Sequence, residues 1–266
     1  MQQNTLTLNH KGASMKKPIT WIFGMLLILS FYSYSLAEET IRLTTGEWPP
    51  FISKDLKHNG FVMRVIKESF AIEGINVEYK FFPWGRAEKL VENGVWDGLA
   101  LQPESPNYLN SDVVAEDRLV FFHLKNFRFD WSETKDLEKI VIGGVLANTY
   151  GENITKMENA NKISIDRVPK EYQNFKKMLL GRIDIFPVGL EFGYSILHKK
   201  FNDQQIEKIT YHPKPLRISY YRLALSKKNE RNKRMLQLFN QGLKKLKTSG
   251  KYDQYLNESR RGEYHQ

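Results

Sequence analysis

Two short stretches of the sequence carry residues that can bind an anion at the start of a helix. Arg86 stands in Phe82-Pro83-Trp84-Gly85-Arg86, within the first helical turn after a strand. A guanidinium there can hold a carboxylate or a phosphate through two parallel hydrogen bonds. Asn148-Thr149-Tyr150 joins another strand to a helix, and exposed N–H groups at a helix N-terminus attract anions. Two alternatives stay open: Arg86 as an ordinary surface arginine, and Asn148 or Thr149 as an N-cap.

The sequence gives weaker support to enzyme chemistry. Glu47 and Glu104 could form a carboxylate pair, although both also suit exposed loops. The chain has no His-x-x-x-His pair, no Gly-x-Ser-x-Gly, no Walker loop, no Gly-x-Gly-x-x-Gly and no cysteine. Its histidines are scattered: His10, His58, His123, His198, His212 and His265. We therefore expect no catalytic residue, no metal site and no cofactor.

Strands and helices alternate along the chain in two similar series, as hydrophobic periodicity and Gly or Pro punctuation indicate. The first series predicts strands at 42–45, 77–82, 99–101 and 119–122, with helices at 61–72 and 83–91. The second predicts strands at 140–145, 163–168 and 183–188, with helices at 150–159 and 169–180. Such alternation is typical of βαβ units and mainly parallel sheets.

One punctuation pattern occurs in both series. Pro83, a helix, Gly94 and Asp97 in the first correspond to Pro169, a helix, Gly181 and Asp184 in the second. In each case proline starts the helix, glycine ends it, and aspartate begins the next strand. Chance reuse of ordinary helix signals is the alternative, but the pattern favours two similar lobes over one long sheet.

The C-terminal part of the chain is expected to return to the first lobe. A β-rich run at 218–225 precedes a long amphipathic helix that includes Met235, Phe239, Leu243 and Leu246. The chain would then cross between lobes near 124–127 and again near 213–218, which makes a two-segment hinge. We expect one lobe of residues 38–122 plus 216–266 and another of residues 123–215. Ligands of open α/β sheets bind beyond the carboxyl ends of the strands.

Composition and charge narrow the class of protein further. The 266 residues include 40 Lys+Arg and 30 Asp+Glu, with 41% hydrophobic residues, which is ample for folded cores. The net charge of +10 is not concentrated in a Lys/Arg-rich run, so we expect no nucleic-acid partner.

The N-terminal region has the pattern of an export signal. Lys16-Lys17 precede an apolar run from Ile19 to Phe31, and Ser35-Leu36-Ala37 place small residues before a predicted cut after Ala37. Residues 1–37 are then an N-terminal extension and signal peptide, with Met15 as the preferred start over Met1. A periplasmic protein follows, and an uncleaved membrane anchor is the alternative.

A set of ordered features between Ile41 and Leu256 resembles family 3 extracellular solute-binding proteins, the receptors of polar amino-acid-type ABC transporters. The features are Ile41-Arg-Leu-Thr-Thr-Gly46 with Trp48-Pro-Pro-Phe51, Gly60-Phe61, Asn93-Gly-Val-Trp-Asp97-Gly98, Gly143-Gly-Val145 with Tyr150-Gly151, Gly181-Arg-Ile-Asp184 and Gly250-Lys-Tyr-Asp253. The resemblance implies a two-lobed, type II periplasmic-binding-protein-like α/β fold. Each lobe would be a mainly parallel sheet flanked by helices.

The resemblance also implies which residues hold a ligand. Trp48 would cover it, Gln102 and Glu104 would supply polar groups, Asn148, Thr149 and Tyr150 would hold its anionic end, and Glu191 stands near the expected amine-binding carboxylate. The loop after Leu101 lacks the arginine that grips a carboxylate in the family, and Arg86 is the candidate substitute. Core packing of Trp48 and a solvated Glu191 are the alternatives.

The expected function is capture of a small polar, carboxylate-bearing solute by a monomeric receptor. Its partner would be a membrane permease or a sensor, and the sequence does not distinguish transport from signalling. Two other classes remain open. One is a dehydratase-like enzyme on the same fold, and the other is a membrane-anchored sensory domain.

Overall fold

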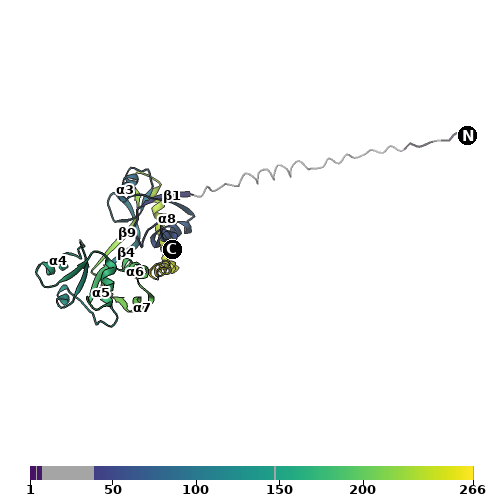
Figure 1. Cartoon of the computed structure of the whole chain (residues 1–266). Helices are drawn as coiled ribbons and strands as arrows, with labels where there is room; N and C mark the ends of the chain where they lie inside the picture. Colours follow the sequence, from purple (N-terminus) through teal and green to yellow (C-terminus); the bar gives the residue numbers. More distant parts are fainter. Residues whose placement is uncertain (4, 8–38, 147, 266) are drawn as a thin grey trace. The chain divides into compact units, whose positions relative to one another are not determined.

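One mixed sheet runs through both lobes of the protein. The structure is a computed structural model that describes residues 1–3, 5–7, 39–146 and 148–265. These residues form a nine-stranded sheet with the order β2-β1-β3-β9-β4-β7-β5-β6, and β8 pairs with β4. β4 and β9 lie at the middle of this order and run between the lobes (Figure 1).

The predicted export signal at residues 16–37 lies outside the described residues, as does its predicted cleavage site. Within the described ranges, no helix combines the length and the apolar character that crossing a membrane requires.

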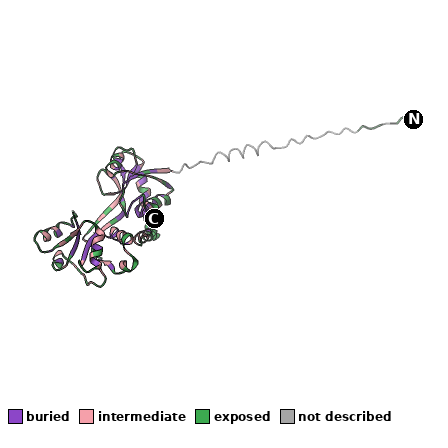
Figure 2. Ribbon diagram, viewed as in Figure 1, coloured by how far each residue is buried: buried purple, intermediate pink, exposed green. Residues whose placement is uncertain are grey.

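The first lobe is built on three parallel strands: β1 (Glu39–Thr45), β2 (Ile75–Phe81) and β3 (Gly98–Pro103). Its helices are α2 (Phe61–Ile72), α3 (Trp84–Glu92), α8 (Asn232–Thr248) and α9 (Lys251–Arg260), with a short 3-10 turn η2 (Lys57–Asn59). Val65, Ile66 and Phe70 are spaced along one face of α2 and are fully buried against α8 and the sheet. Figure 2 shows such buried residues inside both lobes.

The second lobe repeats this design with parallel strands β5 (Ile142–Val145), β6 (Ile165–Val168) and β7 (Ile185–Gly189). Its other elements are η3 (Thr134–Leu137), α4 (Glu152–Asn159), α5 (Glu171–Leu179), α6 (Leu190–Lys200), α7 (Asp203–Ile206) and β8 (Ile209–Tyr211). Apart from the strand at 119–122, the predicted strands and helices are confirmed to within three residues at each end. The sequence did not predict α6, α7 and α9.

The exception is β4 (Tyr108–Leu124), which is far longer than the predicted strand at 119–122. It pairs antiparallel with β9 (Arg217–Ser226), and Glu116, Asp117 and Arg118 lie opposite Tyr220, Ser219 and Ile218. Residues up to Ala115 pack in the first lobe's core, and residues from Leu119 on pack in the second lobe's cores.

The strand therefore changes lobe at Glu116–Arg118, before the predicted boundary at Phe122 and the predicted crossing near 124–127. Phe122 is fully buried against Phe175 in the second lobe. The three charged residues resemble a strand end in the sequence. In the structure these three residues belong to a continuous strand, in the stretch between the part packed in the first lobe's core and the part packed in the second lobe's cores.

The C-terminal segment belongs to the first lobe and also touches the second. Arg64 of α2 binds Glu258 at 2.5 Å and the Tyr264 hydroxyl at 2.9 Å, and its guanidinium lies 3.6 Å from the ring centre of Tyr255. From this anchored segment, Arg260 reaches Glu191 on α6, which lies beside the C-terminal helix (Figure 1).

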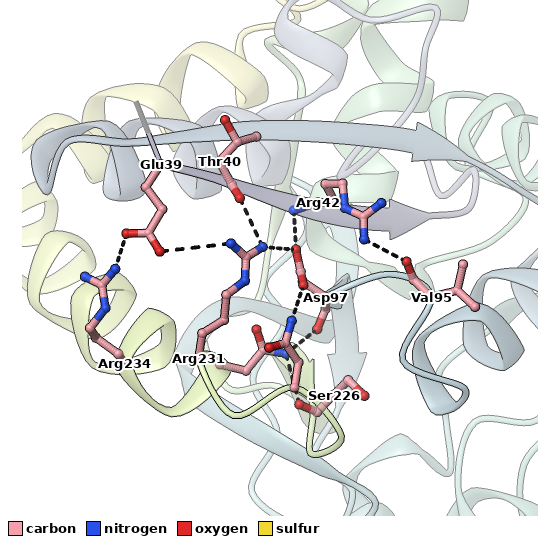
Figure 3. A network of polar contacts seen from close by, with 10 residues as sticks. Glu39, Thr40, Arg42, Val95, Asp97, Ser226, Arg231 and Arg234 are labelled. Carbon is pink, nitrogen blue, oxygen red and sulfur yellow. Dashed lines mark hydrogen bonds and ion pairs between the residues drawn. The ribbon is translucent and has the colours of Figure 1, made fainter. Parts of the chain in front are cut away.

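A polar network fixes the edge of the first lobe where α8 begins (Figure 3). Asp97 is buried and accepts hydrogen bonds from the Arg42 backbone N–H at 2.8 Å and from Arg231 at 2.6 Å. Asn229 donates to its other oxygen at 2.7 Å. The aspartate thus joins β1, β3 and the start of α8.

Candidate functional site

Trp48 lies in the loop after β1 and packs against the hinge strand β9. Its backbone N–H donates to the Ile52 carbonyl at 2.8 Å, which closes the loop. The indole meets the ring of Tyr221 edge-on at 4.6 Å between ring centres, and Phe51 at 5.0 Å. Trp48 remains half-buried, so the loop presents part of a large, rigid aromatic face.

Asp117 lies next to this aromatic pair, in the stretch of β4 between the two cores. Ala115 of β4 lies opposite Tyr221 of β9. Asp117 follows Ala115 by two residues, so the two side chains lie on the same face of the sheet. Its carboxylate has no hydrogen bond and no ion pair with any described residue. Burial raises the pKa of Asp117, and the charge of Arg217 partly offsets that rise. A half-buried carboxylate without a partner is a strong candidate for contact with a ligand.

Gly189, at the end of β7, makes room for this carboxylate. A Cβ at position 189 would stand 2.8 Å from the Asp117 Oδ1 atom. Asp117 therefore occupies the space of a side chain at the carboxyl end of a second-lobe strand. Asp117, on β4, is therefore an acidic candidate close to the end of β7.

Arg217 completes what we call the hinge cluster, which consists of Trp48, Asp117, Arg217 and Tyr221. Arg217 begins β9 and is exposed, and none of the described carboxylates forms an ion pair with it. Burial raises the pKa of Tyr221, and the charge of Asp117 adds to the rise. The cluster thus combines an acid, a base and two aromatic rings on strands and a loop that meet between the lobes.

Arg217 also borders a pocket of about 300 Å3 at the start of α4. The pocket is lined by Trp131, Thr134, Tyr150, Leu216, Arg217 and residues 151–154. Of the predicted loop at 148–150, Tyr150 shares this pocket with Arg217, whereas Asn148 and Thr149 do not line it.

In that loop, Asn148 and Thr149 are exposed and Tyr150 is buried. The Tyr150 hydroxyl accepts a hydrogen bond from the Val145 N–H at 2.8 Å, which gives this residue a structural role. α4 begins at Glu152, after Gly151 with a φ of 106°, and not at Tyr150 as predicted. Neither Asn148 nor Thr149 caps it, so that alternative is wrong. Their contact with a ligand stays a prediction.

Arg86 is exposed on α3, and its guanidinium lies 5.1 Å from the ring centre of Phe82. Within the described chain, no carboxylate pairs with it. The neighbouring Trp84 covers Gly46, where a Cβ would stand only 2.4 Å from the indole, and its Nε1–H donates to the Glu47 carbonyl at 3.3 Å. The start of α3 is therefore held close to the loop of Trp48, and ligand binding by Arg86 stays a prediction.

Gln102 and Glu104 have partners within the protein. Gln102 is half-buried and its amide lies 3.5 Å from Glu88, whereas Glu104 is exposed and pairs with Arg222 at 3.2 Å. Glu47 pairs loosely with Lys54 at 4.0 Å. The two glutamates considered as a carboxylate pair thus each face a different cation.

No protein-family model matches the chain, and no curated protein matches it. Solved structures do match over most of its length. The chain has the fold of the solute-binding proteins of amino-acid ABC transporters.

Three of these structures illustrate the likeness. A polar amino acid ABC uptake transporter substrate-binding protein from Streptococcus thermophilus is 16% identical, with a TM-score of 0.67 over 86% of this chain and 94% of that one. The L-cystine solute receptor of Neisseria gonorrhoeae, unliganded and open, is 17% identical, with a TM-score of 0.66 over 85% and 93%. The second substrate-binding domain of a putative amino acid ABC transporter from Streptococcus pneumoniae is 16% identical, with a TM-score of 0.66 over 83% and 99%. The family resemblance found in the sequence is confirmed at the level of the fold.

Within this solute-binding-protein fold, Glu191 has a partner inside the protein, and its contact with a ligand stays a prediction. It is 6% exposed at the start of α6, and Arg260 donates to both of its oxygens, at 3.1 Å through Nε and 2.6 Å through Nη2. The solvated glutamate considered from the sequence is wrong, because both oxygens are bound inside the protein. Asp117 is a second acidic candidate, without such a partner.

Sequence reasoning missed Asp117, Arg217 and Tyr221. The available signal was the charged triplet Glu116-Asp117-Arg118 inside a β-rich run, which indicates a strand stretch between two cores. The part of the chain that the structure describes contains no group of three or more His, Asp or Glu side chains arranged to hold a metal ion.

Proposed function

We propose that this protein is an exported receptor that captures a small zwitterionic, amino-acid-like solute between its two lobes and presents it to a membrane permease. The observation that carries the proposal is the unpaired, half-buried carboxylate of Asp117 beside the Trp48–Tyr221 pair. It lies where the chain passes from one lobe to the other.

The acidic end of the site suits a cationic nitrogen. An unpaired carboxylate in partly apolar surroundings is costly, and a bound ammonium offsets that cost. Aromatic faces attract the same group through their π electrons, by about 0.5–2 kcal/mol. Trp48, Tyr221 and Asp117 would therefore hold the amino group and exclude water from it.

The basic end suits the carboxylate of the same solute. Arg217 lies near Asp117 without pairing with it, which leaves its N–H donors free for an anion. Arg86 and the exposed residues Asn148 and Thr149 ahead of α4 are further candidates from the two lobes. A solute that carries both charges satisfies both ends at once.

Closure of the lobes would follow from these contacts. A ligand held from both lobes binds more tightly when they approach, so it shifts the population toward the closed form. β4 and β9 supply the hinge, because their residues 116–118 and 218–220 lie outside the buried cores.

The export signal in the sequence supports a periplasmic location, and the fold supports a receptor read by a permease. The membrane-anchored sensor remains the alternative for the N-terminus. The dehydratase-like enzyme remains the alternative for the site, and recovery of unaltered solute after incubation would exclude it.

The deciding experiment is thermal unfolding of the purified protein with amino acids, dicarboxylates, polyamines and sugars. A solute at about 100 times its Kd adds roughly 2.7 kcal/mol, which is a clear rise in Tm. We expect the rise with amino acids, its loss in Asp117→Asn, and its retention in Asp112→Asn, an exposed acid on the same strand. A rise with sugars alone, or no effect of Asp117→Asn, would contradict the proposal.

A further inference from the structure

A second pocket lies on the other face of the hinge strand β4. Glu116 and Arg118 flank Asp117, and side chains of neighbouring strand residues point to opposite faces. Both line a cavity of about 200 Å3, together with Phe61, Glu191, Tyr252 and Arg260. Because Arg118 identifies it, we call this cavity the Arg118 pocket.

The walls of the Arg118 pocket come from both lobes. Phe61 begins α2 and Tyr252 and Arg260 belong to α9, in the first lobe, whereas Glu191 begins α6 in the second. The pair between Arg260 and Glu191 closes one side, with its closest contact at 2.6 Å. The pocket is therefore lined by both lobes and remains partly open to solvent.

Most charged groups around the pocket are already bound. Arg260 and Glu191 neutralise one another, and Lys247 donates to the Val113 carbonyl at 2.8 Å. Burial lowers the pKa of Lys247, which weakens its hold on a proton but leaves it a donor. The guanidinium of Arg118 differs, because no described residue accepts a hydrogen bond from it, pairs with it or stacks on it.

Arg118 is thus a half-buried guanidinium whose five N–H donors lack acceptors among the described residues. A planar guanidinium matches a carboxylate through two parallel hydrogen bonds. Its strand neighbour Glu116 is exposed and forms no ion pair within the described chain. An anion from solution would supply the acceptors that the protein does not.

One wall of the lining is apolar, and it supplies the smaller part of the cavity's exposed surface. Phe61 and Tyr252 meet edge-on at 5.3 Å between ring centres, and Phe51 and Leu256 extend this wall. The Tyr252 hydroxyl is occupied by the Val114 carbonyl at 2.9 Å, so the ring presents its apolar part to the cavity. The cavity of about 200 Å3 has room for a small molecule of a few heavy atoms.

We propose that the Arg118 pocket binds a small aliphatic carboxylate, of the size of propionate or butyrate. The carboxylate would pair with the guanidinium of Arg118, and the alkyl chain would lie against Phe61 and Tyr252. This site is separate from the hinge cluster and does not depend on the proposed function. Because its walls come from both lobes, a carboxylate bound there favours the arrangement in which α6 and α9 touch.

The test is calorimetric titration of the purified protein with sodium butyrate in a buffer free of other carboxylates. We expect saturable binding with a Kd of about 1 mM or lower. Arg118→Gln should weaken it by about tenfold or more, because a charge-assisted hydrogen-bond pair is lost. The matched control Arg128→Gln removes an exposed arginine that follows β4, and should leave the Kd within about twofold.

Three further arms separate the alternatives. Arg118→Lys keeps the charge but not the paired donors, and should weaken binding less than Arg118→Gln while the protein stays folded. Butylamine should not bind, and sulfate should compete poorly because it lacks an alkyl chain. No saturable binding of butyrate, equal binding in both Arg118 variants and the wild type, or equal competition by sulfate would each overturn the proposal.

Discussion

Asp97 and Asp184 make the same pair of backbone contacts in the two lobes. The carboxylate of Asp97 accepts the Arg42 N–H at 2.8 Å, and its own N–H donates to the Arg42 carbonyl at 2.9 Å. Asp184 does the same with Val141, at 2.8 Å in both directions. Each aspartate ties the start of one strand to its parallel neighbour, which explains why the same punctuation precedes both.

Asp97 has an ion pair and Asp184 has none among the described residues. Replacing each aspartate by asparagine should therefore lower the free energy of unfolding by different amounts. Asp97→Asn keeps the acceptor for Arg42 but loses the ion pair of a buried carboxylate with Arg231. We expect a loss of about 2 kcal/mol, below the usual cost of breaking a buried pair because Arg231 is partly exposed. Asp184→Asn keeps its single hydrogen bond and should cost less than about 0.5 kcal/mol. Urea unfolding of both variants measures this, and equal losses would contradict it.

The sequence predicted the alternating elements well because each carries its own local signals. Phe61, Val65 and Phe70 define the buried face of α2, and Gly74, with a φ of 73°, follows its end. The length of β4 escaped prediction for a physical reason. Polarity at Glu116–Arg118 reflects a gap between two cores, and local periodicity cannot distinguish that gap from the end of a strand.

The predicted pH dependence of stability follows from Asp117. Burial raises its pKa in the folded protein above the unfolded value, so the folded state holds the proton more tightly. Stability is then highest below the ordinary pKa of an aspartate and falls as the pH rises through the raised value. Asp117→Asn removes that dependence and should raise Tm at pH 7 by about 2 °C or more, with no gain at pH 3.

Tm measured from pH 3 to pH 8 tests this prediction, with Asp112→Asn as the control because Asp112 is exposed. The same variant should bind solute less well, so stability and binding would move in opposite directions. A lower Tm for Asp117→Asn at pH 7 would show that the carboxylate is stabilised within the protein.

The pair between Glu191 and Arg260 predicts strong energetic coupling. Arg260→Gln leaves a carboxylate that is 6% exposed without its partner, which typically costs about 3–5 kcal/mol. Replacing both residues by glutamine removes the unpaired charge and should recover at least half of that loss. A double-mutant cycle in urea measures the coupling. Additive losses would mean that the two residues act independently.

The candidate site was harder to predict than the fold. The acidic residue without an internal partner is not the one that the sequence suggested. Glu191 is near the expected acid in sequence, but its side chain is bound by Arg260. Asp117 is far from that position in sequence, and register across β4 and β7 brings it beside Gly189. The pairing register between two distant strands cannot be deduced from a single sequence.

Gly189 offers the most direct test of the site, since a single methyl group should displace the Asp117 carboxylate. The backbone φ of Gly189 is −56°, so alanine fits the local conformation, but its Cβ would stand 2.8 Å from Oδ1 of Asp117. We expect Gly189→Ala to weaken binding of the amino acid found in the thermal screen by about tenfold. Its Tm should change by less than about 3 °C, because the carboxylate can swing toward solvent.

The effects of Gly189→Ala and Asp117→Asn on binding affinity should not be additive if both substitutions act on one contact. Once Asp117→Asn has removed the charge, adding Gly189→Ala should weaken binding by less than about twofold, whereas separate roles would give the product of both effects. Titration of the single and double variants decides between these outcomes. Unchanged affinity in Gly189→Ala would remove the Asp117–Gly189 contact from the site, because a displaced carboxylate cannot keep its hold on the ligand.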